Sequence, residues 1–114
     1  MVEIILLNYL SGALDVPVFM EEPESPPASY VVLEKTGSTR SNQIETAVMA
    51  AQSYGRSLLE AARLNVNVKQ AREEARELDS IGSVKLNSDY NFTDPETMRY
   101  RYQCVFNIIC YEVN

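Results

Sequence analysis

The side chains that most often carry catalysis are few in this chain, and their spacing favours none of the common reactions. The 114 residues contain no histidine, which excludes Ser-His and Cys-His nucleophiles and histidine-based zinc sites. The neighbouring carboxylates of Glu21-Glu22 and Glu73-Glu74 could do acid-base work, but we expect both pairs in solvated surface segments. The sequence therefore predicts a protein that is not an enzyme, with no catalytic, cofactor-binding or metal-binding residues.

Two further sequence patterns bear on whether the chain binds nucleotides or nucleic acids. The glycines Gly12, Gly37, Gly55 and Gly82 are scattered, whereas phosphate loops and dinucleotide sites need clustered glycines that open a helix. The segment Arg99–Tyr102 interleaves basic and aromatic side chains, as single-strand nucleic-acid binders do. One such segment in an acidic protein is better explained by strand packing with outward arginines.

Length and charge set the class of protein. With 114 residues the chain is one domain's worth, and 46% of its residues are hydrophobic, but its early apolar run Ile4–Leu7 is far shorter than the roughly 20 residues of a membrane span. Sixteen acidic against ten basic residues give a net charge of −6, which disfavours specific binding to nucleic-acid phosphates. DNA could still pass such a surface without specific binding, and we expect no membrane partner.

The cysteines and the N-terminal residues bear on the cellular compartment in which the protein is made. Cys104 and Cys110 are six residues apart in one predicted strand, hence roughly 20 Å apart, too far for a disulfide. We expect two reduced thiols in the core. Met1-Val2-Glu3 lacks the basic and apolar lead of a secretory signal, which predicts synthesis in the cytoplasm.

The first part of the chain predicts a short helix and two short strands. Val2–Leu14 has the pattern of a helix, and Val16–Met20 that of a strand that Pro17 keeps near a sheet edge. Glu21–Pro27 combines three carboxylates with three prolines, which predicts an exposed, stiff loop. Ser29–Lys35 is rich in β-forming residues, and we expect a turn at Thr36–Thr39.

The middle of the chain predicts a central strand followed by a long helix. Asn42–Ser53 alternates with period two and has apolar residues on both faces, as a strand in the middle of a sheet does. Arg56–Asp79 carries an apolar stripe at three- and four-residue steps, although Asn65–Val68 contains poor helix formers. We expect one unbroken helix that packs on the sheet through Ala61, Leu64, Val68, Ala71, Ala75 and Leu78.

The chain closes with a predicted β-hairpin. Alternation of Val84, Leu86, Tyr90 and Phe92 with polar residues indicates a half-buried strand, and Thr93–Glu96 has turn chemistry. The return strand places six residues on one face: Tyr100, Tyr102, Cys104, Phe106, Ile108 and Cys110. Its other face is polar at first and apolar later: Arg99, Arg101, Gln103, Val105, Asn107, Ile109 and Tyr111. We expect the end of that face to be covered, by the helix or by another subunit.

These elements predict an α+β fold: a single domain over residues 1–114, with a mostly antiparallel sheet of about four to five strands and one long and one short helix packed on it. Their order resembles that of the tail-terminator proteins of long-tailed bacteriophages. The resemblance covers nearly the whole chain. Its best local matches are Tyr30–Arg40, with a β-run, a charged pair and a Thr-Gly turn, and Tyr90–Gln103, where an aromatic residue precedes Asp94-Pro95-Glu96 and Arg101-Tyr102-Gln103 opens the last strand.

The resemblance implies a structural protein of the virion tail or neck, made in the host cytoplasm. Family members form a ring, usually a hexamer, that caps the tail tube and meets the major tail tube protein and the head-completion protein. No catalytic or cofactor residues come with it. Neighbouring neck proteins share much of this pattern, so another head-tail connector is an alternative, as is a small partner-binding α+β module with a concave pocket.

The functional surfaces of such a protein are subunit interfaces. The acidic loop Glu21–Pro27 and the segment Thr36–Arg40 cannot lie in the core, so we expect both to face ring neighbours or the lumen. Guanidinium groups make planar two-point contacts with carboxylates, which favours Arg40 and Arg99 as cations across subunits. The residues predicted for the interface are Glu21, Glu22, Glu24, Arg40, Arg99 and Arg101.

Overall fold

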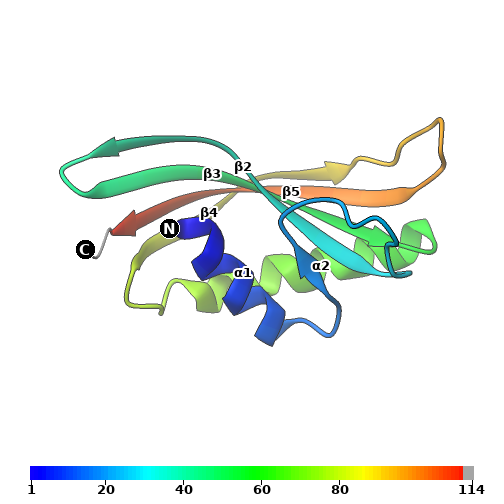
Figure 1. Cartoon of the computed structure of the whole chain (residues 1–114), viewed down its shortest axis with the longest axis horizontal. Coiled ribbons are helices and arrows are strands. Elements are labelled where there is room, and N and C mark those ends of the chain that lie inside the picture. Colours follow the sequence, from blue (N-terminus) through cyan, green and yellow to red (C-terminus); the bar gives the residue numbers. More distant parts are fainter. Residues whose placement is uncertain (112–114) are drawn as a thin grey trace.

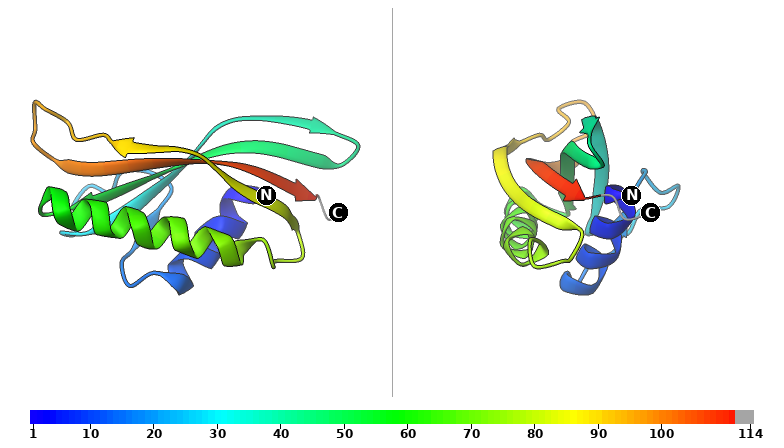
Figure 2. Two further views of the ribbon diagram at one scale, coloured as in Figure 1. Left: turned by 180° about the vertical axis from the view of Figure 1, so that it is seen from behind. Right: turned by 90° about the vertical axis from the view of Figure 1, so that its left-hand side faces the viewer.

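The structure, a computed structural model, describes residues 1–111 and confirms the α+β class (Figure 1). Five strands form one twisted sheet, and both helices pack on the same face of it (Figure 2). The molecule measures 44 × 25 × 25 Å. The elements in chain order are α1 (Val2–Ala13), β1 (Val18–Phe19), β2 (Tyr30–Ser41), β3 (Ile44–Gly55), α2 (Leu58–Ala75), β4 (Ile81–Asn91) and β5 (Tyr100–Tyr111).

The strands lie in the order β1-β2-β3-β5-β4. Every neighbouring pair is antiparallel except β1 and β2, which are parallel over two residue pairs. β3 lies in the middle of the sheet, as its two half-apolar faces predicted, and β1 lies at one edge beside β2. The loop between β1 and β2 is exposed at Glu21, Glu22 and Glu24, as its prolines and carboxylates predicted.

Helix α2 provides the largest part of the core. Ser57 caps its start, because the Ser57 hydroxyl accepts a hydrogen bond from the Glu60 N–H at 3.1 Å, which satisfies one of the free donors of the first turn. The helix is unbroken through Asn65–Val68, as predicted. Four members of the predicted stripe are buried and two are partly buried against the core; the buried ones are Ala61, Leu64, Val68 and Ala75.

Helix α1 covers the remaining part of the same face. Its buried residues Val2, Leu6 and Leu10 recur every four residues and face the sheet and α2. The Tyr9 hydroxyl donates to the Ala71 carbonyl oxygen at 2.9 Å, which ties α1 to α2. Within residues 1–111, no helix packs on the other side of the sheet (Figure 2).

The turn expected at Thr36–Thr39 is wrong. β2 continues to Ser41 through a bulge between Lys35 and Gly37, and the chain turns at Asn42 and Gln43 instead. Both of these residues have left-handed backbone angles, with φ of 51° and 64°, as two-residue hairpin turns require. The bulge absorbs the Thr-Gly pair without ending the strand, because one extra residue can loop out of a ladder. The result is a long β2–β3 hairpin that projects past the helices (Figure 1).

The single phase expected for Val84–Phe92 is also wrong. Val84 and Leu86 pair with Ile108 and Phe106 on the helix side of the sheet. A register shift between Leu86 and Ser88 then moves Tyr90 to the opposite face, where it pairs with Gln103. A bulge changes which residues face the core, and the alternation of the sequence gives no sign of it.

The two cysteines are buried thiols, as predicted. Cys104 is 0% exposed and Cys110 is 3% exposed, both on the helix-covered face of β5. Burial raises the pKa of the Cys104 thiol to about 12, which keeps it protonated and chemically inert at neutral pH.

Two valines of α2, Val66 and Val68, test whether the apolar stripe of the helix packs against the sheet. Val68 is 0% exposed and Val66 is 44% exposed. We expect Val68→Ala to lower the free energy of unfolding by about 2 kcal/mol, because it leaves a small cavity against the sheet. The control Val66→Ala should change it by less than about 0.5 kcal/mol. Urea denaturation of both variants is the measurement, and equal effects would contradict the packing described.

Candidate functional site

The sheet face opposite the helices is only partly covered. Near β1, Tyr30, Val32 and Tyr54 are buried, with Phe19 packed against them. Further along β3 and β5 the side chains on this side reach solvent. We call this region the open face, and it consists of Ile44, Thr46, Val48, Val105, Asn107, Ile109 and Tyr111. The apolar end of β5 is therefore not covered by a helix, which was one of the two expectations, and no other described element covers it.

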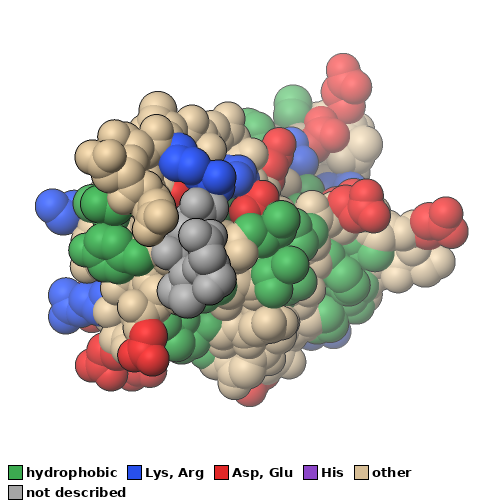
Figure 3. All heavy atoms as spheres, turned by 60° about the vertical axis from the view of Figure 1, so that its left-hand side comes forward, with side chains coloured by type: hydrophobic (Ala, Val, Ile, Leu, Met, Phe, Trp, Pro, Cys, Tyr) green, Lys and Arg blue, Asp and Glu red, His purple; other side chains and the backbone are tan. Residues whose placement is uncertain are grey.

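Exposed apolar side chains gather at both ends of the long axis. At the end formed by the β2–β3 hairpin and the end of β5, Ile44, Ile109 and Tyr111 are 39%, 36% and 47% exposed. The start of α1 lies beside them, and hydrophobic side chains reach the surface there among charged ones (Figure 3). At the opposite end, Leu58, Leu59 and Met98 are exposed at the start of α2 and in the β4–β5 turn. We call the two regions the arm end and the turn end.

Tyr111 is held in place by a close approach of the backbone. A side chain at Gly82 of β4 would meet the Tyr111 hydroxyl oxygen at 2.7 Å. Only glycine leaves room for the tyrosine ring there. Gly82 lies in a register shift between Ile81 and Ser83 of β4, and this irregularity leaves space for the Tyr111 ring at the arm end.

A cluster of tyrosines and arginines covers the part of the face next to the turn end. The rings of Tyr30 and Tyr54 stack at 4.4 Å between centroids. The Arg99 guanidinium lies over the Tyr54 ring at 4.9 Å, and that of Arg101 over the Phe92 ring at 4.4 Å. Such contacts are worth roughly 0.5–1 kcal/mol each where they are exposed.

Arg99 also fixes the acidic loop. Its Nη2 atom lies 2.6 Å from Glu22 Oε1, and both groups hydrogen-bond the Tyr30 hydroxyl. Arg101 donates to the Tyr54 hydroxyl at 3.1 Å and to the Phe92 carbonyl at 2.6 Å. A pocket of about 290 Å³ opens beside this cluster, lined by Pro26, Pro27, Tyr54, Arg56, Met98 and Tyr100 among others.

The predicted interface residues therefore fall into two places. Glu22, Arg99 and Arg101 meet in the tyrosine-arginine cluster, with Glu21 and Glu24 exposed in the loop beside it. Arg40 is exposed near the tip of the β2–β3 hairpin, close to Glu45 and far from the others. Arg99 forms its ion pair with Glu22 within the chain, so a cross-subunit role for Arg99 stays a prediction.

Sequence reasoning missed the partners of these arginines. Tyr30 and Tyr54 pair directly across β2 and β3, a pairing that a turn at Thr36–Thr39 does not predict. A turn at Asn42-Gln43, with one bulged residue, would have aligned them. Asn followed by a polar residue between two β-rich runs was the available signal.

The base of the β2–β3 hairpin carries a second ion-pair site. Lys35 Nζ lies 3.0 Å from Glu45 Oε2 and 3.4 Å from Glu3 Oε2, which joins β2, β3 and α1. The hydrogen bond to Glu45 raises the pKa of Lys35 above its ordinary value. Burial alone would raise the pKa of Glu45, but Lys35, with Ser38 and Arg40, outweighs it and lowers that pKa.

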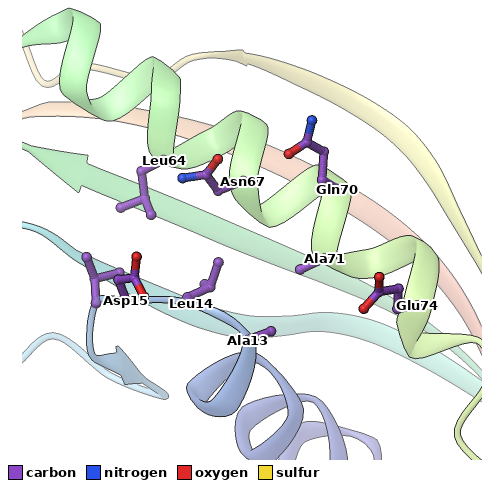
Figure 4. Close-up of a pocket in the computed structure, with 9 residues that line it drawn as sticks. Ala13, Leu14, Asp15, Leu64, Asn67, Gln70, Ala71 and Glu74 are labelled. Carbon is purple, nitrogen blue, oxygen red and sulfur yellow. The ribbon is translucent and has the colours of Figure 1, made fainter.

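The hollow between the two helices is not built like a ligand site. A pocket of about 400 Å³ lies between the end of α1 and α2 (Figure 4). Leu14, Leu64 and Ala71 form its apolar part, while Asp15 and Gln70 come from opposite walls and do not converge on one point. Recognition of a small molecule needs polar groups that converge.

Comparison with known proteins adds no relative. No protein-family model matches the chain, and a search of curated proteins finds no match. Within residues 1–111, no three carboxylate or thiol groups gather in a way that could hold a metal ion. In the same residues, no helix is both long and apolar enough to cross a membrane.

The Arg99 contacts predict protection of the acidic loop. Arg99→Ala removes the ion pair with Glu22, so we expect a glutamate-specific protease to cut faster after Glu24, measured by mass spectrometry of the fragments. The control Arg76→Ala removes an exposed arginine at the end of α2 and should leave the cleavage rate unchanged. Equal rates in all three proteins would show that Arg99 does not hold the loop.

The Lys35–Glu45 pair predicts a stability difference that depends on pH. Because the pKa of folded Glu45 lies below 4.5, its contribution is present above that pH and is lost as the pH falls through the folded value. Because the pKa of Lys35 lies above 10.5, its contribution is lost only at more alkaline pH. We expect Glu45→Gln to be less stable than the wild type near neutral pH, with the gap closing on acidification. Thermal unfolding from pH 3 to 8 measures it, and a constant gap would contradict the pairing.

Proposed function

We propose that this chain is a structural ring-forming subunit of a bacteriophage tail, of the tail-terminator kind. In this role identical copies cap the tail tube and meet the head-completion proteins, and DNA passes without specific binding. The observation that carries the proposal is the presence of exposed apolar side chains at opposite ends of the subunit, on a sheet whose helices cover only one face.

Apolar patches at opposite ends favour a ring over a two-fold dimer. A patch that meets a different patch on the next copy makes a heterologous contact, which repeats around a ring when the rotation closes. The arm end presents Ile44, Ile109 and Tyr111, and the turn end presents Leu58, Leu59 and Met98 next to the tyrosine-arginine pocket. One end can thus insert its side chains into the hollow of the other.

The assignment to phage tails rests on the resemblance of the element order and of Tyr30–Arg40 and Tyr90–Gln103. Within the first segment, the Thr-Gly pair lies in a bulge of β2 and not in a turn. The order of helices and strands, with a closing β-hairpin, supports the resemblance. A head-tail connector of the same neck remains the alternative role.

A matched pair of lysine substitutions tests the assembly. Ile109 on the open face and Val66 on α2 are similarly exposed, at 36% and 44%. We expect Ile109→Lys to raise the concentration of half-assembly at least tenfold, because an interface would bury the ammonium group. Val66→Lys should assemble like the wild type.

Light scattering at high micromolar concentration, followed by addition to purified tail tubes, is the measurement. A wild-type chain that stays monomeric in both settings would contradict the proposal. Phage that lack the protein separate the two roles in the neck, since loss of a terminator gives overlong tails and loss of a connector gives heads that do not join tails.

A further inference from the structure

The acidic loop borders a groove with an apolar floor. The groove has a volume of about 460 Å³ and is lined by α1, β1 and the loop. Its apolar side chains are those of Leu7, Val18, Phe19 and Met20. Met20 is 44% exposed, and the carboxylates of Glu21, Glu22 and Glu24 stand around it. The groove therefore suits a partner that brings an apolar side chain together with a positive charge.

Two of the three carboxylates are available to such a partner. Glu22 is already engaged by Arg99, at 2.6 Å from its Nη2 atom, and by the Tyr30 hydroxyl. Glu21 and Glu24 are exposed, and neither forms an ion pair or a hydrogen bond with the described residues. Because Arg99 fixes the loop, Glu21 and Glu24 lose little conformational freedom when a cation binds them.

The groove adjoins the tyrosine-arginine pocket. Pro26 and Pro27 of the acidic loop line that pocket, while Glu21 and Glu24 of the same loop line the groove. A neighbour that contacts the loop can therefore reach both hollows. This continuity joins the groove to the turn end, where the proposed ring contact already places another copy.

The open face supplies the complementary chemistry at Lys85. This residue of β4 is exposed, and it has no ion pair or hydrogen bond within residues 1–111. Lys85 pairs with Asn107 of β5, and Ile109 is the next residue of β5 on the same face. Diagonal neighbours on one face of a sheet lie about 7 to 8 Å apart. The open face thus presents the Lys85 ammonium group and the exposed Ile109 side chain together.

Lys85 differs from the other basic residues of the sheet and its hairpins. Lys35 and Arg99 form ion pairs within the chain, and Arg101 donates to a tyrosine hydroxyl. Arg40 also has an interaction within the chain. Of these five residues, Lys85 is the cation that a second copy can use.

The two surfaces lie at opposite edges of one sheet. β1, which lines the groove, is one edge strand, and β4, which carries Lys85, is the other. The two surfaces are therefore free to meet on different copies of the chain. Because they differ from each other, the contact is heterologous and repeats around a ring when the rotation closes. The partner whose chemistry fits the groove is thus a second copy of this chain.

We propose that the Lys85 ammonium group of one copy binds the Glu21 and Glu24 carboxylates of the next, while Ile109 lies over the apolar floor of the groove beside them. The aliphatic part of a lysine covers apolar surface while its charged end stays at the rim. Opposite charges at the rim of an interface fix its register and exclude wrong partners. This inference rests on the ring assembly proposed above and names its charged contact.

Charge reversal tests the contact from both sides. One protein carries Lys85→Glu, and a second carries Glu21→Lys with Glu24→Lys. We expect each alone to need about tenfold more protein for half-assembly in light scattering, because like charges then face each other. The control Arg76→Glu makes the same charge change as Lys85→Glu on an exposed residue at the end of α2, and it should assemble like the wild type.

An equal mixture of the two reversed proteins separates a lost contact from a lost fold. In the mixture the Lys85→Glu subunit can place its new carboxylate against the reversed loop of its neighbour. Its own acidic loop can bind the unchanged Lys85 of that same protein. We expect the mixture to assemble close to the wild-type concentration, with the two proteins alternating around the ring.

The outcomes distinguish this inference from the proposed function. A Lys85→Glu protein that assembles as readily as the wild type would overturn the charged contact and leave the ring intact. Reversed proteins that are weakened alone and stay weakened in the mixture would do the same. A mixture that gives only pairs of unlike subunits would support the contact and contradict the ring. A wild-type chain that stays monomeric would contradict both.

Discussion

The structure depends on the burial of one face of the sheet by a helix that is shorter than the strands it covers. Helix α2 has 18 residues and spans about 27 Å, whereas the 12 residues of β3 span about 40 Å. The apolar stripe around Val68 fills the space between them. Because α2 cannot reach the full length of the strands and no helix of the described part of the chain covers the second face, the hairpins project at both ends and apolar side chains stay exposed.

Polar interactions orient the hairpin and the loop that the core does not hold. Lys35 connects the base of the β2–β3 hairpin to α1 through Glu45 and Glu3, and Arg99 holds the acidic loop against Tyr30 and Tyr54 through Glu22. The Lys35–Glu3 and Arg99–Glu22 ion pairs join segments that are distant in the sequence. The same chain thus has an ordered arm at one end and an ordered aromatic surface at the other, both on a rigid layer.

Much of the fold could be predicted from hydrophobic periodicity, and the predictions that were wrong share one cause. The α2 stripe, the central place of β3 and the buried face of β5 follow from periods of 3.6 and 2 in the sequence. The turn at Asn42-Gln43 and the changed phase of Tyr90 do not, because a bulge adds one residue to a strand without a compositional signal. Less of the candidate site than of the fold could be predicted. Arg99 and Glu22 were identified, but their partners Tyr30 and Tyr54 depend on the strand register.

The most direct test of the central claim is hydrogen-deuterium exchange of the protein, compared between dilute and concentrated solutions. If the helices complete one face and identical copies complete the rest, amides around Ile44, Ile109 and Tyr111 at the arm end become protected on concentration, while those around the buried Val68 of α2 keep the same exchange rates. Protection that appears around Val68 and spares the arm end would contradict the account.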